Sequence, residues 1–209
     1  MVSFASDYVE GAHPLILKRL LYSNMEQLPG YGMDHYCANA REKIRALCQI
    51  PDADVFFLSG GTQANQVVIS SLLYSCQGVV AAKTSHIALH EAGAIEYSGH
   101  KVMELPSRQG KLEAERLRDF LDEFWRDGNR EHMVFPGMVY ISWPTEYGTL
   151  YSRQELTEIH QICEEFRLPL FVDCARLGYG LMSRKCDLTF PELAALCDVF
   201  TVSVGCKGV

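Results

Sequence analysis

Short apolar runs recur along the chain, and several of them show no alternation with polar positions. Each run is rich in β-branched or aromatic residues and is bounded by glycine, proline or charge, which is typical of β-strands. Strands that are apolar on both sides are expected where helices cover both faces of a sheet. We predict six strands, at residues 54–59, 78–83, 100–105, 137–143, 168–173 and 198–204.

Stretches with the helical spacing of apolar residues lie between these strands. They cover residues 62–76, 113–128 and 152–167, and the last opens with Ser152 and Glu155 at the spacing of a capping box. Alternating strands and helices predict an α/β domain of three layers, α/β/α, with a mostly parallel mixed sheet. Ligands of such sheets bind at the carboxyl ends of the strands, so the residues after each strand are the candidates for chemistry.

Composition narrows the class of protein and its partners. The 209 residues, 48% of them hydrophobic, are enough for one compact domain with a sizeable core. The formal net charge is -7 and Lys and Arg form no basic stripe, so nucleic acid and anionic membranes are poor partner candidates. The N-terminal segment lacks the features of a signal peptide, and no apolar window has the length of a membrane helix. We therefore expect a soluble, cytoplasmic protein.

The eight cysteines do not form a metal-binding or disulfide pattern. No two stand in a Cys-x-x-Cys pair, and most lie within apolar or helical runs such as RALCQI and HQICEEF. Cysteines at such positions act as small hydrophobic side chains when they are reduced. We therefore predict reduced thiols and no bound metal.

The turn after the first predicted strand contains Ser59, Gly60, Gly61 and Thr62 and leads into a predicted helix. Glycines there expose backbone N–H groups at a helix N-terminus, where the partial positive charge favours an anion such as a phosphate. The turn matches neither a P-loop nor a dinucleotide-binding fingerprint. It is therefore either an anion site or an ordinary tight connection.

Two histidines follow the second predicted strand. His86 and His90 lie one helical turn apart, with Glu91 beside them. A His-x-x-x-His pair can ligate a metal, but here the glutamate follows the second histidine and no third ligand is evident. An aromatic platform for a ligand, or a structural histidine, fits this segment better than a metal site.

Two further strand ends carry charged residues. Asp173 ends the fifth predicted strand, and Arg176 follows three residues later. The carboxylate either caps the next turn and pairs with Arg176, or contacts a cationic atom of a ligand. Lys207 follows the sixth predicted strand among apolar neighbours, where partial burial favours use of a lysine as a nucleophile. Four strand ends thus present an anion cradle, a histidine, an aspartate and a lysine in chain order.

These segments resemble the threonine aldolase and aromatic amino acid β-eliminating lyase family, whose members are fold-type I pyridoxal-phosphate enzymes. The resemblance covers nearly the whole chain and corresponds to the large domain of those enzymes. Seven ordered motifs at family-like spacing are a far more specific signal than any one of them. They are SDYVEGAHP (6–14), LPGYGMDHY (28–36), SGGTQANQ (59–66), TSHIALHEAGAIEYSGHKV (84–102), WPTEYGTLYS (143–152), FVDCARLGYGL (171–181) and DVFTVSVGCK (198–207).

The resemblance implies a site for pyridoxal 5'-phosphate with three catalytic residues. Lys207 corresponds to the lysine that holds the cofactor covalently, and Asp173 to the carboxylate that pairs with the pyridine nitrogen. His86 corresponds to the imidazole that stacks on the cofactor ring and is an acid–base candidate near the substrate hydroxyl in the aldolases.

Four further residues match binding positions of the family. Gly61 and Thr62 correspond to the backbone amides that bind the cofactor phosphate, in agreement with the anion site inferred from the turn itself. Arg176 corresponds to an arginine that contacts the substrate carboxylate or the phenolic oxygen of the cofactor. Ser6 matches a serine near the substrate carboxylate, although Tyr8 stands where the family more often has asparagine.

The implied activity is that of a lyase or aldolase of amino-acid metabolism that cleaves a β-hydroxy amino acid such as threonine to glycine and an aldehyde. A small-molecule amino acid is the expected substrate, and the full-length family forms homo-oligomers. The sequence departs from the family at Cys206, where Ser or Thr usually precedes the lysine, and the interval from Asp198 to Lys207 is one residue longer than usual.

We expect the chain to lack the small C-terminal domain of the family and its second carboxylate-binding arginine. We therefore expect residues 1–50 to form an N-terminal arm and helical segment, and residues 51–209 to form a cofactor-binding large domain that ends after the lysine strand. The alternatives to an active aldolase are a truncated, catalytically impaired relative that keeps the fold and cofactor binding, and a β-eliminating lyase of the same fold.

Overall fold

The computed structural model of the protein describes residues 11–203, and these residues fall into two compact units. Of the described residues, one unit contains 11–57 and 203, and the other contains 58–202. The division expected after residue 50 stays a prediction.

Two helices form the regular structure of the first unit. Helix α1, Pro14–Ser23, has a proline at its first position, where a missing N–H costs the helix no hydrogen bond. Helix α2, His35–Cys48, begins after Asp34, whose carboxylate accepts a hydrogen bond from the Cys37 N–H at 2.9 Å. This cap explains why the second helix starts where it does.

The run at residues 54–59, expected as the first strand, is not a strand in the structure. Its backbone joins no ladder within residues 11–203; instead, the Val55 carbonyl accepts a hydrogen bond from Arg41 at 3.2 Å. Phe56 is 80% exposed. An apolar run becomes a strand only where a neighbour pairs its N–H and C=O groups, so strand propensity alone was a wrong guide here.

A five-stranded sheet forms the centre of the second unit. Its order is β2-β1-β5-β6-β7, and all four pairings are parallel. The other five expected strands are therefore confirmed. The strands β3 and β4 form a separate antiparallel pair. The bounds are β1 Gln77–Ala82, β2 Val102–Leu105, β3 Ser107–Arg108, β4 Lys111–Leu112, β5 Phe135–Ser142, β6 Leu170–Cys174 and β7 Val199–Val202.

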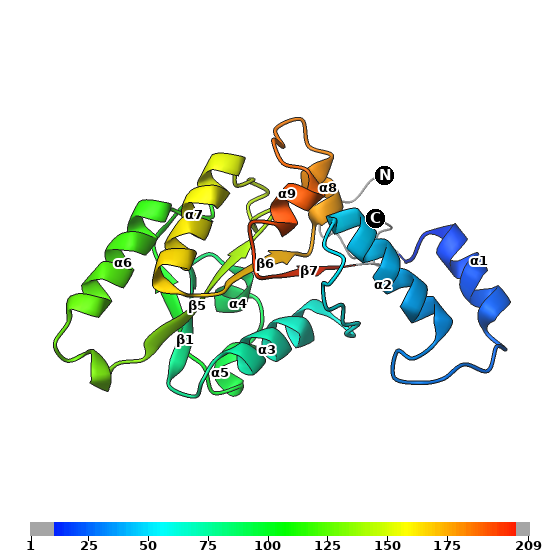
Figure 1. Cartoon of the computed structure of the whole chain (residues 1–209), viewed down its shortest axis with the longest axis horizontal. Coiled ribbons are helices and arrows are strands. Elements are labelled where there is room, and N and C mark those ends of the chain that lie inside the picture. Colours follow the sequence, from blue (N-terminus) through cyan, green and yellow to red (C-terminus); the bar gives the residue numbers. More distant parts are fainter. Residues whose placement is uncertain (1–10, 204–209) are drawn as a thin grey trace. The chain divides into compact units, whose positions relative to one another are not determined.

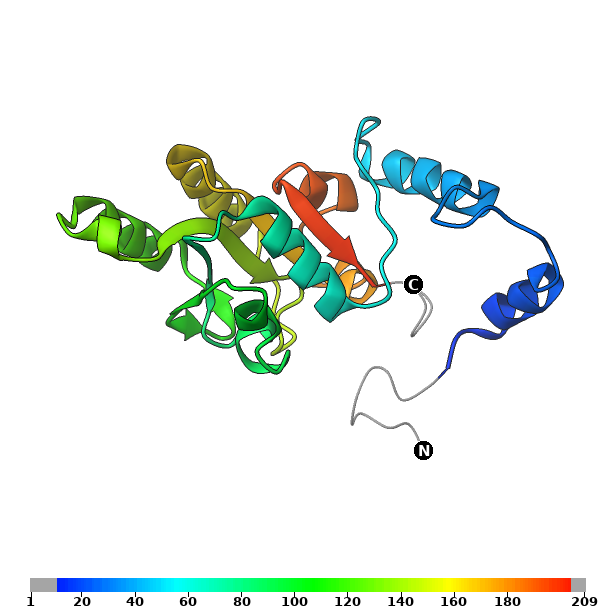
Figure 2. The same cartoon turned by 90° about the horizontal axis from the view of Figure 1, so that it is seen from below.

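Helices lie on both faces of this sheet, which confirms the α/β/α layers expected from the sequence. Helices α3 and α5 lie on one face, and α6 and α7 lie on the other (Figure 1). The view from below shows α3 in front of the strands (Figure 2). The helices of this unit are α3 Gly61–Leu72, α4 His86–Leu89, α5 Ala94–Tyr97, α6 Ala114–Arg126, α7 Arg153–Phe166, α8 Leu177–Leu181, α9 Phe190–Ala194 and the short 3-10 helix Arg130–His132.

Successive residues of each strand face opposite layers, because side chains of a strand point alternately to its two sides. In β5, Ile141 packs in the cluster under α6 and α7, whereas Tyr140 packs in the cluster under α3. In β6, Phe171 belongs to the α3 cluster. Asp173 stands two residues further on, so the same alternation directs its carboxylate toward the α3 layer.

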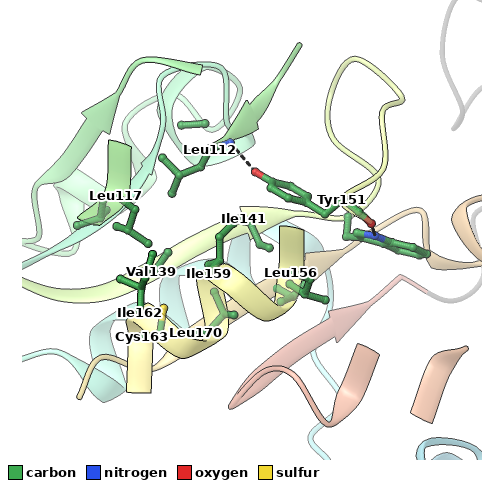
Figure 3. Packing of buried hydrophobic residues seen from close by; sticks show 14 of the residues in the cluster. Leu112, Leu117, Val139, Ile141, Tyr151, Leu156, Ile159, Ile162, Cys163 and Leu170 are labelled. Atoms are coloured by element: carbon green, nitrogen blue, oxygen red, sulfur yellow. Dashed lines mark hydrogen bonds between the residues drawn. The ribbon is translucent and has the colours of Figure 1, made fainter. Parts of the chain in front are cut away.

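The face under α6 and α7 holds the larger cluster of buried side chains (Figure 3). Leu117 of α6 and Leu156 of α7 are both fully buried there, and each contributes roughly 1.5–3 kcal/mol by leaving water. The buried Tyr151 accepts a hydrogen bond from the Leu112 N–H at 2.6 Å, and its carbonyl accepts one from the Trp143 indole at 3.1 Å. This face is therefore a closed core, and the chemistry of the sheet lies toward α3.

Candidate active site

Asp173 lies at the carboxyl end of β6, paired in register with Ser142 of β5 and Thr201 of β7. It is only 6% exposed, yet both of its oxygens have hydrogen-bond partners. Two carboxylate oxygens accept about four hydrogen bonds, so Asp173 is fully satisfied by its surroundings. The four donors are the Tyr140 hydroxyl (2.7 Å) and Asn65 Nδ2 (3.3 Å) to Oδ2, and the Ala175 N–H (3.0 Å) and Thr201 hydroxyl (3.2 Å) to Oδ1.

His86 is the first residue of α4, in the connection that follows β1. Its side chain is 37% exposed, so part of the ring is open to a ligand. The His86 N–H donates a hydrogen bond to Oε1 of Glu146 at 2.9 Å, and the Ser142 hydroxyl donates one to the same oxygen at 2.5 Å. The Glu146 carboxylate thus holds the start of α4 against the end of β5.

Asn65 of α3 connects Asp173 to a second buried carboxyl group. Its Nδ2 donates hydrogen bonds to Oε1 of Glu91 at 2.7 Å and to Oδ2 of Asp173 at 3.3 Å. The Glu91 side chain is fully buried, and its Oε1 lies 3.8 Å from Nε2 of His86. Asn65, Glu91, His86 and Asp173 therefore form one polar cluster at the carboxyl edge of the sheet.

Burial changes the acid–base properties of two residues at this edge. It raises the pKa of the Glu91 carboxyl, while the hydrogen bond from Asn65 and the proximity of His86 act in the opposite direction. Burial also raises the pKa of Tyr140 well above its usual value, and the charge of Asp173 adds to that effect. Because a neutral phenol donates a hydrogen bond, Tyr140 remains a donor to Asp173 throughout the neutral pH range.

The N-terminus of α3 has the open space that an anion needs. Gly60 is the residue before the helix. Within the described residues, no side chain caps this end of α3 with a hydrogen bond. A Cβ atom at Gly60 or Gly61 would meet no atom of residues 11–203 within 4 Å. Gly61 and Thr62 therefore lie at an uncapped helix N-terminus, where backbone N–H groups favour an anion. Both precede Asn65 by about one helical turn, which joins this end of α3 to the polar cluster.

Arg176 stands directly before α8 and is half-buried. Its carbonyl accepts a hydrogen bond from the Gly180 N–H at 3.1 Å. The turn that leads to it is capped by Asp173, whose Oδ1 accepts the Ala175 N–H at 3.0 Å. One of the two interpretations of Asp173 from the sequence was that it caps the next turn and pairs with Arg176. The cap is confirmed.

Ser6, Cys206 and Lys207 lie outside the described residues. Among the site residues that the structure does describe, Asp173 and His86 come together through Asn65 and Glu91, although they are far apart in the sequence. What these residues do toward a cofactor or substrate stays a prediction.

Several residues of this edge were not singled out from the sequence. Strand alternation could have found the two on β5, because Tyr140 and Ser142 share the face of β5 that looks toward α3. No local pattern marks a glutamate in a loop or an asparagine inside a helix as a partner of a distant carboxylate. The residues missed are Asn65, Tyr140, Ser142, Glu146 and Thr201, and Glu91 was noted only as a neighbour of two histidines.

No group of three or more His, Cys, Asp or Glu side chains in residues 11–203 is arranged to hold a metal ion. The rings of His86 and His90 are tilted to one another, with centroids 5.6 Å apart. Over the same range, no helix is both long and apolar enough to cross a membrane.

The chain belongs to the Beta-eliminating lyase family, whose family model matches residues 3–208. Low specificity L-threonine aldolase of Pseudomonas sp. (strain NCIMB 10558) is 34% identical over 177 residues, which are 84% of this chain and 50% of that protein. The chain thus spans about half the length of the curated relatives it matches. The family resemblance seen in the sequence is confirmed.

Solved structures confirm the fold-type I class. Threonine aldolase of Leishmania major matches with a TM-score of 0.92 and 46% identity, over 97% of this chain and 58% of that chain. The PLP-bound C-S lyase of Staphylococcus hominis has the same fold, with a TM-score of 0.62 and 14% identity over 92% of this chain and 49% of that one.

Pyridoxal phosphate, the cofactor that the resemblance implies, fits the polar groups present at this edge. Of the four donors to Asp173, Asn65 is the most distant, and it keeps Glu91 as a nearer acceptor. It can therefore release Asp173 to a protonated ring nitrogen without losing its own partner. Buried polar atoms that have no partner within the described residues also gather here. They are Asn65 Oδ1, Ser85 Oγ, Glu91 Oε2 and Glu146 Oε2.

Proposed function

We propose that this protein is a pyridoxal-phosphate-dependent lyase that cleaves a β-hydroxy amino acid such as threonine to glycine and an aldehyde. The observation that carries the proposal is the meeting of Asp173 and His86 in one polar cluster beside the open N-terminus of α3. The 46% identity with threonine aldolase of Leishmania major, over nearly the whole chain, supports the choice of substrate.

Five residues would hold the cofactor. The backbone N–H groups of Gly61 and Thr62 would bind its phosphate, Asp173 would accept a hydrogen bond from its ring nitrogen, and the His86 ring would lie against it. Lys207 would hold it covalently through its amine. When bound, pyridoxal phosphate supplies an electron sink for the electron pair that remains on Cα when the Cα–Cβ bond breaks.

Asp173 and its donors would control the charge at the ring nitrogen. The Tyr140 hydroxyl donates to one oxygen of Asp173 and the Ala175 N–H to the other, so the carboxylate has little freedom to turn away. A carboxylate held at one place would keep a proton on the ring nitrogen of the bound cofactor, which would make the ring a better electron acceptor.

Two residues would orient the substrate. Arg176 would pair with its carboxylate in the forked geometry that guanidinium and carboxylate groups favour, and Ser6 would donate a further hydrogen bond. Cleavage requires that the proton of the β-hydroxyl leave as Cα and Cβ separate. His86, with an imidazole that is partly open, is the acid–base residue of the cluster and would accept that proton.

Covalent labelling tests the cofactor part of this proposal. The purified chain is incubated with pyridoxal phosphate, reduced with borohydride, digested with trypsin and analysed by mass spectrometry. Because a modified lysine resists trypsin, the label is expected on a peptide of residues 186–209. The Lys207→Arg variant keeps the positive charge and is the matched control, which should carry no label at this position. Label spread over surface lysines with none on Lys207 would overturn the assignment.

Turnover tests the substrate part. The loaded protein is incubated with threonine, and acetaldehyde is measured by a coupled alcohol dehydrogenase assay. We expect acetaldehyde and glycine in equal amounts, and no product from Lys207→Arg. Labelling of Lys207 without release of acetaldehyde would reject threonine cleavage while keeping the cofactor site.

A further inference from the structure

The hydrogen bonds of the polar cluster leave part of the Glu91 carboxyl group without a partner. Its side chain is fully buried, and Oε1 accepts the hydrogen bond from Asn65 at 2.7 Å. Oε2 has no hydrogen-bond partner within residues 11–203. A buried oxygen without a partner destabilises a fold, so packing alone does not explain a carboxyl group at this position.

The backbone fixes the position of Glu91. Directly after it, Ala92 and Gly93 have φ values of 51° and 75°, and the left-handed conformation is strained for alanine. The Ala94 N–H then donates a hydrogen bond to the Glu91 carbonyl at 3.0 Å as α5 begins. This sharp reversal keeps the backbone of Glu91 in place, with its side chain held in the cluster.

Glu91 lies behind His86 with respect to a ligand. The His86 side chain is 37% exposed whereas that of Glu91 is 0% exposed, and Oε1 is 3.8 Å from Nε2. That separation is slightly longer than a hydrogen bond, as is common for catalytic pairs before a ligand binds. A ligand would touch the imidazole, and the imidazole would touch the carboxyl group.

We propose that Glu91 is a positioning residue for His86 and that the two side chains share one proton. This inference rests on the proposed function. As Cα and Cβ separate, the hydroxyl proton passes to one ring nitrogen of His86, and the proton on Nε2 passes to Oε1 of Glu91. The reverse transfer returns His86 to its starting state when a proton is delivered to Cα. No other bond at either side chain is made or broken.

The groups around Glu91 favour this exchange. Burial raises the pKa of the carboxyl group, and the Asp173 charge also raises it. The Asn65 hydrogen bond, the His86 ring and the Thr62 side chain lower it. The net effect is upward, and burial is its largest cause. A carboxyl group whose pKa is raised holds a proton passed to it more readily than an ordinary glutamate does.

The first experiment needs no cofactor and no turnover. Histidine residues labelled with ¹³C are followed by NMR as pH is varied, and the His86 signal is assigned by its loss in His86→Gln. In Glu91→Gln, which keeps an acceptor for Asn65, we expect the His86 titration midpoint to fall by about 0.5–1 pH unit, because a carboxylate that favours the imidazolium is gone. Glu96→Gln removes an exposed carboxylate five residues away and should leave the midpoint unchanged.

A second measurement follows the titration of the unsubstituted protein and uses a variant only for assignment. In the unsubstituted protein labelled at glutamate carboxyl carbons, the Glu91 signal should titrate in two steps, one of which coincides with the His86 step, because two coupled groups share their titrations. The Glu91 signal is assigned by its loss in Glu91→Gln. Circular dichroism on each variant checks that it is folded.

With pyridoxal phosphate bound, Glu91→Gln should lower kcat for threonine cleavage by about 10–100-fold, with KM changed by less than about threefold. The pH profile of kcat should lose its dependence on the shared proton, whereas Glu96→Gln should behave like the unsubstituted protein. An unchanged His86 midpoint in Glu91→Gln, or an unchanged kcat, overturns the inference. If the unsubstituted protein does not cleave threonine at all, the proposed function fails, and the NMR titrations still decide whether Glu91 and His86 share a proton.

Discussion

The phenol of Tyr140 donates a hydrogen bond of 2.7 Å to Oδ2 of Asp173, across two neighbouring parallel strands. Tyr140 is fully buried and cannot turn to water for another partner. Strand alternation places both side chains on the face toward α3, so the bond follows from the register of β5 and β6. Tyr140 is therefore a structural determinant of where the Asp173 carboxylate lies.

Replacing Tyr140 by phenylalanine removes this donor and keeps the ring in the core. We expect the free energy of unfolding to fall by about 1.5–3 kcal/mol, the usual range for a hydrogen bond to a charged group. Affinity for pyridoxal phosphate should fall as well, because Asp173 loses its nearest donor. Urea denaturation and cofactor titration measure the two effects. Tyr74→Phe, at a 78% exposed position, is the control and should stay within about 0.5 kcal/mol of the unsubstituted protein.

Substitutions at Gly60, the residue before α3, can distinguish the stability of the helix from its ability to bind an anion. Gly60 has extended backbone angles and space around it, so Asp or Asn is accommodated there. Both are good helix caps and should raise stability by a few tenths of a kcal/mol. Gly60→Asp should weaken binding of phosphate and pyridoxal phosphate by about tenfold more than Gly60→Asn, through charge repulsion. Equal affinities of the two variants, measured by calorimetry, would argue against an anion site at this helix.

Local sequence patterns were enough to predict which residues lie at the carboxyl edge of the sheet. Asp173 lies at the end of the apolar strand β6 and His86 follows β1, and the carboxyl ends of parallel strands meet at one edge. The partners of these residues could not be read in the same way. Asn65 lies 108 residues before Asp173 in the sequence, and their contact depends on how α3 packs across the sheet. Such a contact exists only once the tertiary structure is formed.

The wrong prediction at residues 54–59 has a related cause. Apolar composition there resembles that of the five confirmed strands, but a strand forms only where a neighbouring strand pairs with its backbone. By contrast, the capping box at Ser152 and Glu155 is local, and the structure has both of its hydrogen bonds. Local chemistry was predictable, and pairing over long distances was not.

Loss of that cap should affect stability without affecting the site. Ser152→Ala removes the oxygen that accepts the Glu155 N–H at 3.2 Å, and we expect a loss of about 1 kcal/mol in the free energy of unfolding. Helix α7 packs on the face of the sheet opposite α3, so labelling of Lys207 by pyridoxal phosphate should be unchanged. Urea denaturation and the labelling assay check the two parts. Reduced labelling in a folded variant would contradict the separation of the two faces.

Glu91 should make the free energy of unfolding fall as pH rises, whereas a salt-bridged carboxylate makes it rise. Its pKa in the folded protein is raised, chiefly by burial, above the usual value of 4.5. As pH rises past the unfolded value, the unfolded chain loses this proton first while the folded protein retains it. The folded state then binds more protons, so the free energy of unfolding falls as pH rises through the folded pKa.

Glu91→Gln has no such titration. We therefore expect the free energy of unfolding of Glu91→Gln, minus that of the unsubstituted protein, to increase from pH 4 to neutral pH, whereas Glu96→Gln should show no comparable trend. Urea denaturation at a series of pH values measures this difference. A difference that stays constant or decreases would mean that burial does not hold the Glu91 proton. A variant that gains stability at neutral pH while losing turnover would show that this carboxyl group serves the reaction at a cost to the fold.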